Sequence, residues 1–173
     1  EDMGKMIRFY RDVLGFEIKE PENAENVINL PEDITLLSAP LDKTYLVSTS
    51  AMDLICKIGA IDNIRLSGTK EKDWFIDLAK ENMLNGNILY AGKYSMPDYE
   101  LILSEGCNLA IENTMIYHNP ETKEKLQEVG IPVLVEKSSY ERDPLGRLEW
   151  IKLYGLLFNH LSEAEDYYNE QAK

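Results

Sequence analysis

The chain has 173 residues, of which 44% are hydrophobic, and a formal net charge of −13 from 18 basic and 31 acidic side chains. This hydrophobic fraction is ordinary for a folded domain and excludes general disorder. The acidic balance argues against duplex nucleic acid and anionic membrane surfaces, since both require a basic footprint. The sequence has no run of about 18 apolar residues, so it predicts no membrane-spanning segment.

Residues 1–30 differ in character from the rest and are expected to form an N-terminal appendage. Apolar residues at near-helical spacing, followed by Gly15, predict a helix, and FEI (16–18) predicts the start of a strand. The string FYRDVLGF (9–16) resembles the first helix and following strand of the glyoxalase, or vicinal oxygen chelate, family. It supplies no assignable metal ligand, so a docking helix with an edge strand is the favoured interpretation.

Residues 44–67 predict a strand, a short helix and a second strand. TYLV (44–47) and IRL (64–66) are β-rich, and the amphipathic segment between them ends at Gly59, which suits a helix C-cap. This pattern is typical of the βαβ crossover of parallel sheets. The polar turn Ser48–Ser50 follows the first strand, where open α/β sheets bind their ligands.

The alternation continues to the end of the chain. A helix is expected from Trp74 to about Met83, with Phe75 facing inward, and another begins at Ser95–Pro97. Ser162 and Glu165 predict a capping box for the last helix. Other strands are expected at 34–37, 88–92, 108–111 and 131–135, and other helices at 120–129 and 145–158. The order predicts a three-layer α/β fold, a mostly parallel sheet with helices on both faces.

The sequence presents no catalytic set and no metal site. It lacks GxGxxG, GxxxxGK[ST], GxSxG and HExxH, which disfavours a dehydrogenase or NTPase. Of the two histidines, His118 is interpreted as a surface residue, with a ligand role as the alternative. Cys56 and Cys107 lack the spacing of a metal site and are interpreted as buried free thiols.

Polar and aromatic residues recur where the predicted strands end. Because the carboxyl ends of parallel strands lie on one edge of a sheet, these residues predict a binding face without a nucleophile–base pair. The five sets are residues 48–50, 67–70, 92–94, 112–115 and 136–140.

From about Pro31 onward, roughly 140 residues resemble the amino-terminal lobe of an ABC-transporter substrate-binding protein of the iron-siderophore, haem and cobalamin class. Cys107-Asn108 stands where this family usually has Pro-Asp before a strand. The stretches that carry the resemblance are YLVSTSAMDLICKIGAIDNI (45–64), GKYSMPDYELILSEGCNLAI (92–111) and IPVLVEKSSYERDPLGRLEWIKLYGLLFNHLSEAE (131–165).

The resemblance implies two lobes that clasp a ligand and are joined by one long helix. Residues 31–158 would form the substrate-binding lobe, residues 159–173 would begin the interlobe helix, and the second lobe would lie outside this chain. The protein would be a non-enzymatic receptor that delivers a ferric siderophore, haem or cobalamin to an ABC permease, with no intrinsic cofactor. Its location would be extracytoplasmic, either periplasmic or lipid-anchored at the cell surface.

The resemblance also places the ligand contacts in the loops at the strand ends. Lys70 and Arg142 would pair with an anionic ferric chelate, and three aromatic rings would stack on its organic shell. Trp74 suits a core position equally well. The expected contacts are Thr49, Lys70, Trp74, Tyr94, Thr114, Met115, Tyr140 and Arg142. Glu100 matches the surface acid that meets arginines of the permease, and the alternative is an ordinary solvated carboxylate.

Two other functions stay open on the sequence alone. A small α/β enzyme would use Glu112 and Glu136 at the strand ends for acid–base work. A glyoxalase-like metalloprotein fragment would rest on residues 1–30 only.

Overall fold

The computed structural model describes residues 35, 37 and 40–173, and all elements given below lie in the unit Leu37–Lys173. The appendage predicted at 1–30 lies outside the described residues, as does most of the strand predicted at 34–37.

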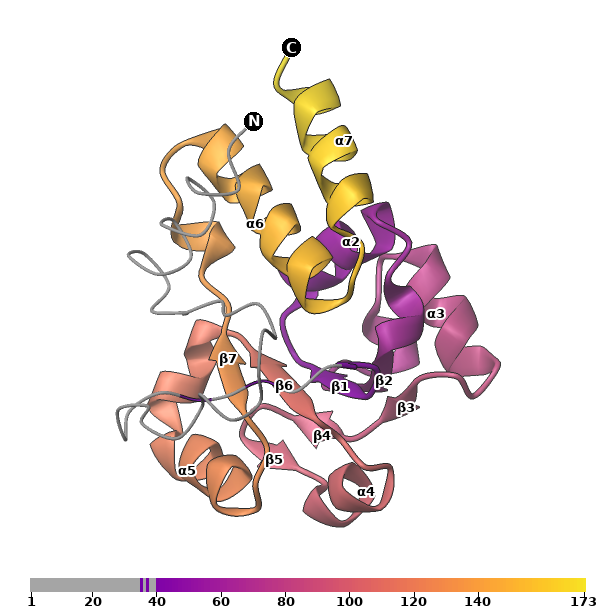
Figure 1. Ribbon diagram of the computed structural model, residues 1–173. Helices are drawn as coiled ribbons and strands as arrows, with labels where there is room; N and C mark the ends of the chain where they lie inside the picture. Colours follow the sequence, from indigo (N-terminus) through magenta and orange to yellow (C-terminus); the bar gives the residue numbers. More distant parts are fainter. Residues whose placement is uncertain (1–34, 36, 38–39) are drawn as a thin grey trace, which may run out of the picture. The chain divides into compact units, whose positions relative to one another are not determined.

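The centre of this unit is a five-stranded parallel sheet in the order β3-β2-β1-β6-β7 (Figure 1). In the middle of the sheet, Tyr45 pairs with Leu66 on one side and with Ala110 on the other. A separate antiparallel hairpin follows β3. The strands are β1 Thr44–Leu46, β2 Ile64–Ser67, β3 Leu89–Tyr90, β6 Leu109–Glu112 and β7 Val133–Val135, and the hairpin consists of β4 Gly92–Lys93 and β5 Met96–Pro97.

Helices cover both faces of the sheet, which confirms the predicted α/β fold class. Figure 1 shows α2, α6 and α7 on one side and α4 and α5 on the other. The α-helices are α2 Thr49–Lys57, α3 Asp77–Leu84, α4 Tyr99–Ser104, α5 Pro120–Glu128, α6 Pro144–Leu157 and α7 Leu161–Gln171. Short 3₁₀ helices are η2 Ile61–Asn63, η3 Glu71–Asp73, η4 Thr114–His118 and η5 Ser138–Tyr140.

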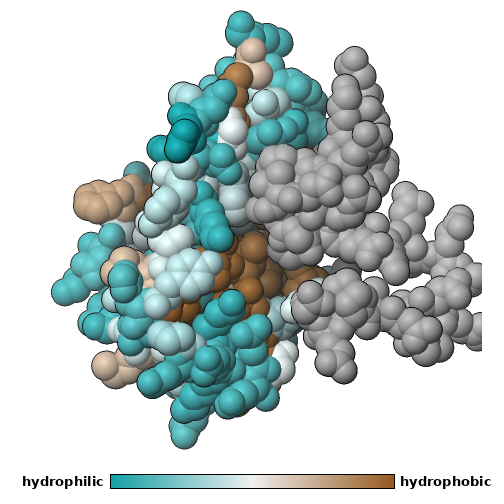
Figure 2. Space-filling view, turned by 90° about the vertical axis from the view of Figure 1, so that its left-hand side faces the viewer, coloured by the Kyte–Doolittle hydropathy of each residue, from teal (hydrophilic) through white to brown (hydrophobic). Residues whose placement is uncertain are grey.

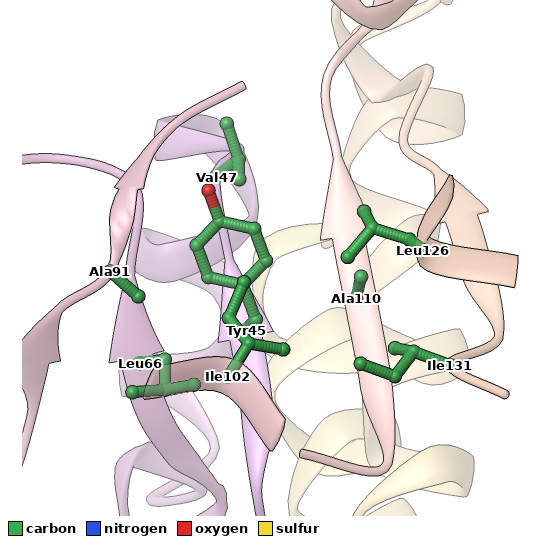
Figure 3. Packing of buried hydrophobic residues seen from close by; sticks show 8 residues of the cluster. All are labelled: Tyr45, Val47, Leu66, Ala91, Ile102, Ala110, Leu126 and Ile131. Carbon is green, nitrogen blue, oxygen red and sulfur yellow. The ribbon is translucent and has the colours of Figure 1, made fainter. Parts of the chain in front are cut away.

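The sheet is buried on both faces. Figure 3 shows Tyr45 among the apolar side chains of the α4 and α5 side, which include Leu66, Ile102 and Leu126. On the other side, buried residues of α2 and α6, such as Ile55 and Ile151, complete the core. Burial on both faces explains why β1 reads as a continuous apolar run instead of an alternating one. The face in Figure 2 is largely hydrophilic at its periphery, in keeping with the net charge of −13.

The predicted helix at 74–83 starts three residues late, and the inward orientation of Phe75 is wrong. The Trp74 indole Nε1 donates to the Ser67 hydroxyl at 3.2 Å, and this side chain is only 2% exposed. Residues 74–76 are therefore held extended, and α3 begins at Asp77. Phe75 consequently points away from the core and is 97% exposed.

The helix predicted to begin at Ser95–Pro97 is also wrong in its first turn, which is the strand β5. Gly92 has a φ of +82°, a conformation that glycine adopts without strain. Gly92 opens the hairpin β4–β5, in which it pairs with Pro97 and Lys93 pairs with Met96. The helix starts afterwards, where the Asp98 carboxylate accepts from the backbone N–H of Leu101 at 3.0 Å.

The predicted capping box is wrong as well. Asn159 has a φ of 61° and turns the chain between α6 and α7, so His160 is the N-cap and Ser162 already lies inside α7. The helix stop predicted at Gly59 is shifted by one residue, since Ile58 is the C-cap of α2 and Gly59 follows it with a φ of 72°.

Candidate ligand-binding edge

All five strands of the sheet run in the same direction, so the segments that follow them share one edge. We call this the carboxyl edge and define it as residues 47–50, 68–76, 90–98, 113–119 and 136–143. The five polar sets predicted from the sequence lie at the ends of the strands that lead into these segments.

Large exposed apolar side chains gather on the carboxyl edge. They form six of the eleven exposed large hydrophobic side chains in the described residues, and Phe75 is the most exposed of them. Such a concentration on an otherwise charged surface marks an interaction face. The six are Phe75, Tyr90, Met96, Met115, Tyr117 and Tyr140.

Lysines accompany two of these rings. The Lys70 ammonium lies 5.5 Å from the centre of the Tyr90 ring, and the Lys137 ammonium lies 5.8 Å from that of Tyr117. Both distances are within the range of a cation–π interaction. The edge therefore offers positive charge and flat apolar surface together, which suits a ligand with anionic groups and an organic shell.

A cavity of about 500 Å³ opens where β2 and β3 end. Of the predicted contact residues, Lys70 lines it. The strand-end sets predicted from the sequence also include Gly68, Thr69 and Lys93, whereas the other four lining residues were missed, Met96 because residues 95–97 read as a helix start. The lining residues are Gly68, Thr69, Lys70, Lys72, Asp73, Tyr90, Lys93 and Met96.

The structure brings two other predicted residues together at the ends of β6 and β7. The hydroxyl groups of Thr114 and Tyr140 are 2.9 Å apart and share a hydrogen bond. Met115 is exposed beside Thr114 in η4, and Arg142 is exposed beyond η5. Thr49 is also exposed and begins α2.

The two remaining aromatic residues of the predicted set are less available. Trp74 is a core residue whose indole is held by Ser67, which is the core position named as the alternative. Tyr94 is half-buried and packs against the core cluster around Tyr45. A buried ring has no free face for a ligand, so Trp74 is not available as a ligand contact.

Glu136 links two segments of the carboxyl edge, 47–50 and 136–143. One carboxylate oxygen accepts from the hydroxyl groups of Ser48 at 2.9 Å and Ser50 at 2.8 Å. The other accepts from the backbone N–H of Ser138 at 2.5 Å. Because it is fully engaged and only 2% exposed, Glu136 positions these loops and is not placed for acid–base chemistry.

Glu112 is a buried carboxyl group at the end of β6, which lies next to the central strand β1. It is 0% exposed, and neither of its oxygens has a hydrogen-bond partner among the described residues. Burial raises the pKa of Glu112 from 4.5 to about 8. Since Glu112 is enclosed and Glu136 is engaged, the two carboxylates do not form the exposed pair that the enzyme alternative needs.

Among the described residues, the remaining reactive side chains form no metal-binding cluster. Within residues 40–173 and the two described positions before them, no three His, Cys, Asp or Glu side chains lie close enough together to hold a metal ion. Cys56 and Cys107 are free thiols, as predicted, but both are only partly buried, and burial raises the pKa of Cys56 to about 11. In the same part of the chain, the helices are too short or too polar to cross a membrane.

No family model matches the sequence. Among curated proteins, the chain is 25% identical over 148 residues to an uncharacterized lipoprotein of Methanocaldococcus jannaschii, covering 82% of this chain and 35% of the relative. The chain thus spans about one third of the length of this relative.

Solved structures with the same fold are substrate-binding proteins. A periplasmic heme-binding protein from Pseudomonas aeruginosa matches with a TM-score of 0.57 at 14% identity, over 76% of this chain and 43% of that one. The iron uptake ABC transporter substrate-binding protein PiuA from Streptococcus pneumoniae matches with a TM-score of 0.58 at 19% identity, over 75% and 43%. These likenesses confirm the fold predicted from the family resemblance, and they extend over less than half of each solved chain.

Proposed function

We propose that this chain is part of the solute-binding component of an ABC importer, which captures an iron complex and delivers it to a membrane permease. The ligand is a ferric siderophore or a haem-like chelate, with cobalamin as the third member of the class. The protein acts as a receptor without a catalytic step. Its location is extracytoplasmic, in the periplasm or anchored by lipid at the cell surface.

The observation that carries this proposal is the composition of the carboxyl edge. Exposed aromatic and methionine side chains lie there, and lysines accompany two of the rings. Such an edge can hold an organic chelate by stacking and charge pairing. The names of the similar solved proteins support the ligand class, and the lipoprotein relative supports the location.

Titration of the full-length natural protein tests the ligand class. We expect saturable quenching of tryptophan fluorescence by at least one of three probes, namely a ferric siderophore, haem and cobalamin. Trp74 and Trp150 are both 2% exposed, so their emission reports a change of the whole lobe instead of the local solvent. If none of the three probes binds, the proposed function is wrong.

A pair of variants links the binding to the carboxyl edge. Tyr140→Ala removes an exposed ring beside Thr114 and is expected to weaken binding about fivefold, because one aromatic contact contributes about 1 kcal/mol. Leu84→Ala removes an exposed apolar side chain at the end of α3, away from the edge, and should leave the affinity unchanged. Equal affinities of the two variants would contradict a ligand contact at Tyr140.

Charge reversal at Glu100 tests docking to the permease. Glu100 is exposed in the first turn of α4, where lysine costs only about 0.5 kcal/mol against the helix dipole. Glu100→Lys in the full-length protein is expected to impair cellular uptake while the ligand affinity stays within about twofold. Glu124→Lys, at an exposed position in α5, is the matched control. Normal uptake with Glu100→Lys would remove the docking role.

A further inference from the structure

The cavity at the ends of β2 and β3 is positively charged in a protein that is strongly acidic overall. Its lining contains three lysines, Lys70, Lys72 and Lys93, against one aspartate, Asp73. All four side chains are exposed to solvent, so the lysines are free to turn toward a ligand. With a formal net charge of −13 on the chain, this local excess of positive charge is opposite to the general composition.

Two segments of the carboxyl edge, 68–76 and 90–98, bring the lysines together. Lys70 follows the β2 strand, Lys72 lies in η3, and Lys93 belongs to β4 of the hairpin. Gly92 places that hairpin strand, because a Cβ at this position would collide with the carbonyl oxygen of Met96. The fold therefore adds Lys93 to two lysines, Lys70 and Lys72, that are already close in the sequence.

One side of the cavity is flat and apolar. Tyr90 lies under the Lys70 ammonium at 5.5 Å, and the exposed Met96 side chain also lines the cavity. The volume of about 500 Å³ falls within the range of small-molecule sites, roughly 300–1,000 Å³. A single inorganic oxyanion would leave most of this space and the aromatic side unused. The dimensions favour an organic anion.

We propose that this cavity is the subsite for the negatively charged part of the ligand, and that the protein prefers chelates with a net negative charge. The proposal rests on the proposed function and adds the charge class and the residues that select it. Anionic oxygens of the chelate lie against Lys70, Lys72 and Lys93, and its organic part lies on Tyr90. Lysine suits this task because its ammonium is a point charge that accepts many ligand geometries.

Two ferric complexes of similar size and different charge test the proposal. The probes are a negatively charged ferric tris-catecholate and an uncharged ferric trihydroxamate, each titrated into the full-length natural protein. The wild type is expected to bind the anionic complex more tightly. The variant Lys70→Gln/Lys72→Gln/Lys93→Gln should lose about 30-fold in affinity for it, given the usual strength of exposed charge pairs, and change less than about threefold for the uncharged one.

A second triple variant controls for the change in net charge. Lys43→Gln/Lys57→Gln/Lys80→Gln removes the same charge from positions outside the carboxyl edge and should keep wild-type selectivity. Raising the ionic strength about tenfold should weaken anionic binding in the wild type and in this control, but much less in the cavity variant.

The outcomes separate the two proposals. Equal losses of anionic affinity in both triple variants, or unchanged selectivity in the cavity variant, would overturn the anionic subsite and leave the receptor function standing. Binding of the uncharged complex alone would also overturn the anionic subsite and leave the receptor function standing. If neither ferric complex binds, and haem and cobalamin also fail, both proposals are wrong.

Discussion

Replacing Glu112 with glutamine is expected to stabilise the protein at pH 8 by up to about 4 kcal/mol relative to the wild type, and to leave the two nearly equal near pH 4. The reason is the buried, unpartnered carboxyl group at the end of β6. Glutamine has nearly the same shape and cannot ionise, so it removes the cost of a buried charge without opening a cavity.

The direction of the effect follows from the two pKa values. Burial raises the pKa of Glu112 from 4.5 to about 8 in the folded protein. Between these values the unfolded chain releases the proton and the folded protein keeps it, so the free energy of unfolding falls as the pH rises. The contribution of the neutral Glu112 side chain to the free energy of unfolding is fully present below pH 4.5. It is lost as the pH approaches and passes 8.

Urea unfolding of the natural protein at several pH values between 4 and 9 measures this difference. The difference in the free energy of unfolding between Glu112→Gln and the wild type should widen steadily up to about pH 8 and then level off. Glu124→Gln, at an exposed position of α5, serves as the control and should follow the wild-type profile. A constant gap across the whole range would show that Glu112 is not a protonated acid in the folded protein.

Gly155→Ala is expected to destabilise the protein by about 2–3 kcal/mol, although alanine is the better helix former. A Cβ at Gly155 would lie 2.6 Å from the Cβ of Ala164 and 2.8 Å from the carbonyl oxygen of His160. These atoms belong to α7 and to its N-cap, and none is the end of a flexible side chain. The two helices must therefore separate to admit the methyl group.

Gly146→Ala in the same helix α6 provides the matched control. The nearest atom to a Cβ there is 3.7 Å away, which is ordinary contact, so this change should gain up to about 1 kcal/mol from helix propensity. Urea unfolding of both variants gives the comparison. Stabilisation by both substitutions would mean that α6 and α7 do not pack closely at Gly155.

The contact at Gly155 also bears on the proposed role of residues 159–173 as the start of an interlobe helix. An interlobe helix fixed to α6 would move with this lobe.

The sheet was predictable because its signals are local. Apolar β-rich runs such as 44–47, and glycines such as Gly59, mark where strands and helices end regardless of the tertiary structure. The alternation of strands and helices then implies a parallel sheet, and a parallel sheet implies a shared carboxyl edge. The location of the candidate site follows from these steps without knowledge of any side-chain contact.

Individual side chains on that edge were less predictable because tertiary contacts decide their orientation. In Trp74-Phe75 either ring suits the core, and the hydrogen bond from Trp74 to Ser67 selects the first. Glu136 reads as a polar loop residue until Ser48 and Ser50 are seen beside it. The lysine cavity depends on a hairpin whose sequence, with a proline near a predicted first turn, imitates the start of a helix.

The position of β1 at the centre of the sheet has a consequence for the synthesis of the protein. Its partner β2 follows closely in the chain, but its other partner, β6, is about 65 residues away, as the contact between Lys43 and Asn108 illustrates. At roughly 5–20 residues per second, a ribosome leaves one edge of this apolar strand unpaired for about 3–13 seconds. An unpaired apolar strand edge invites association with other chains. We therefore expect the growing polypeptide to be prone to association with other chains until Glu112 has been added.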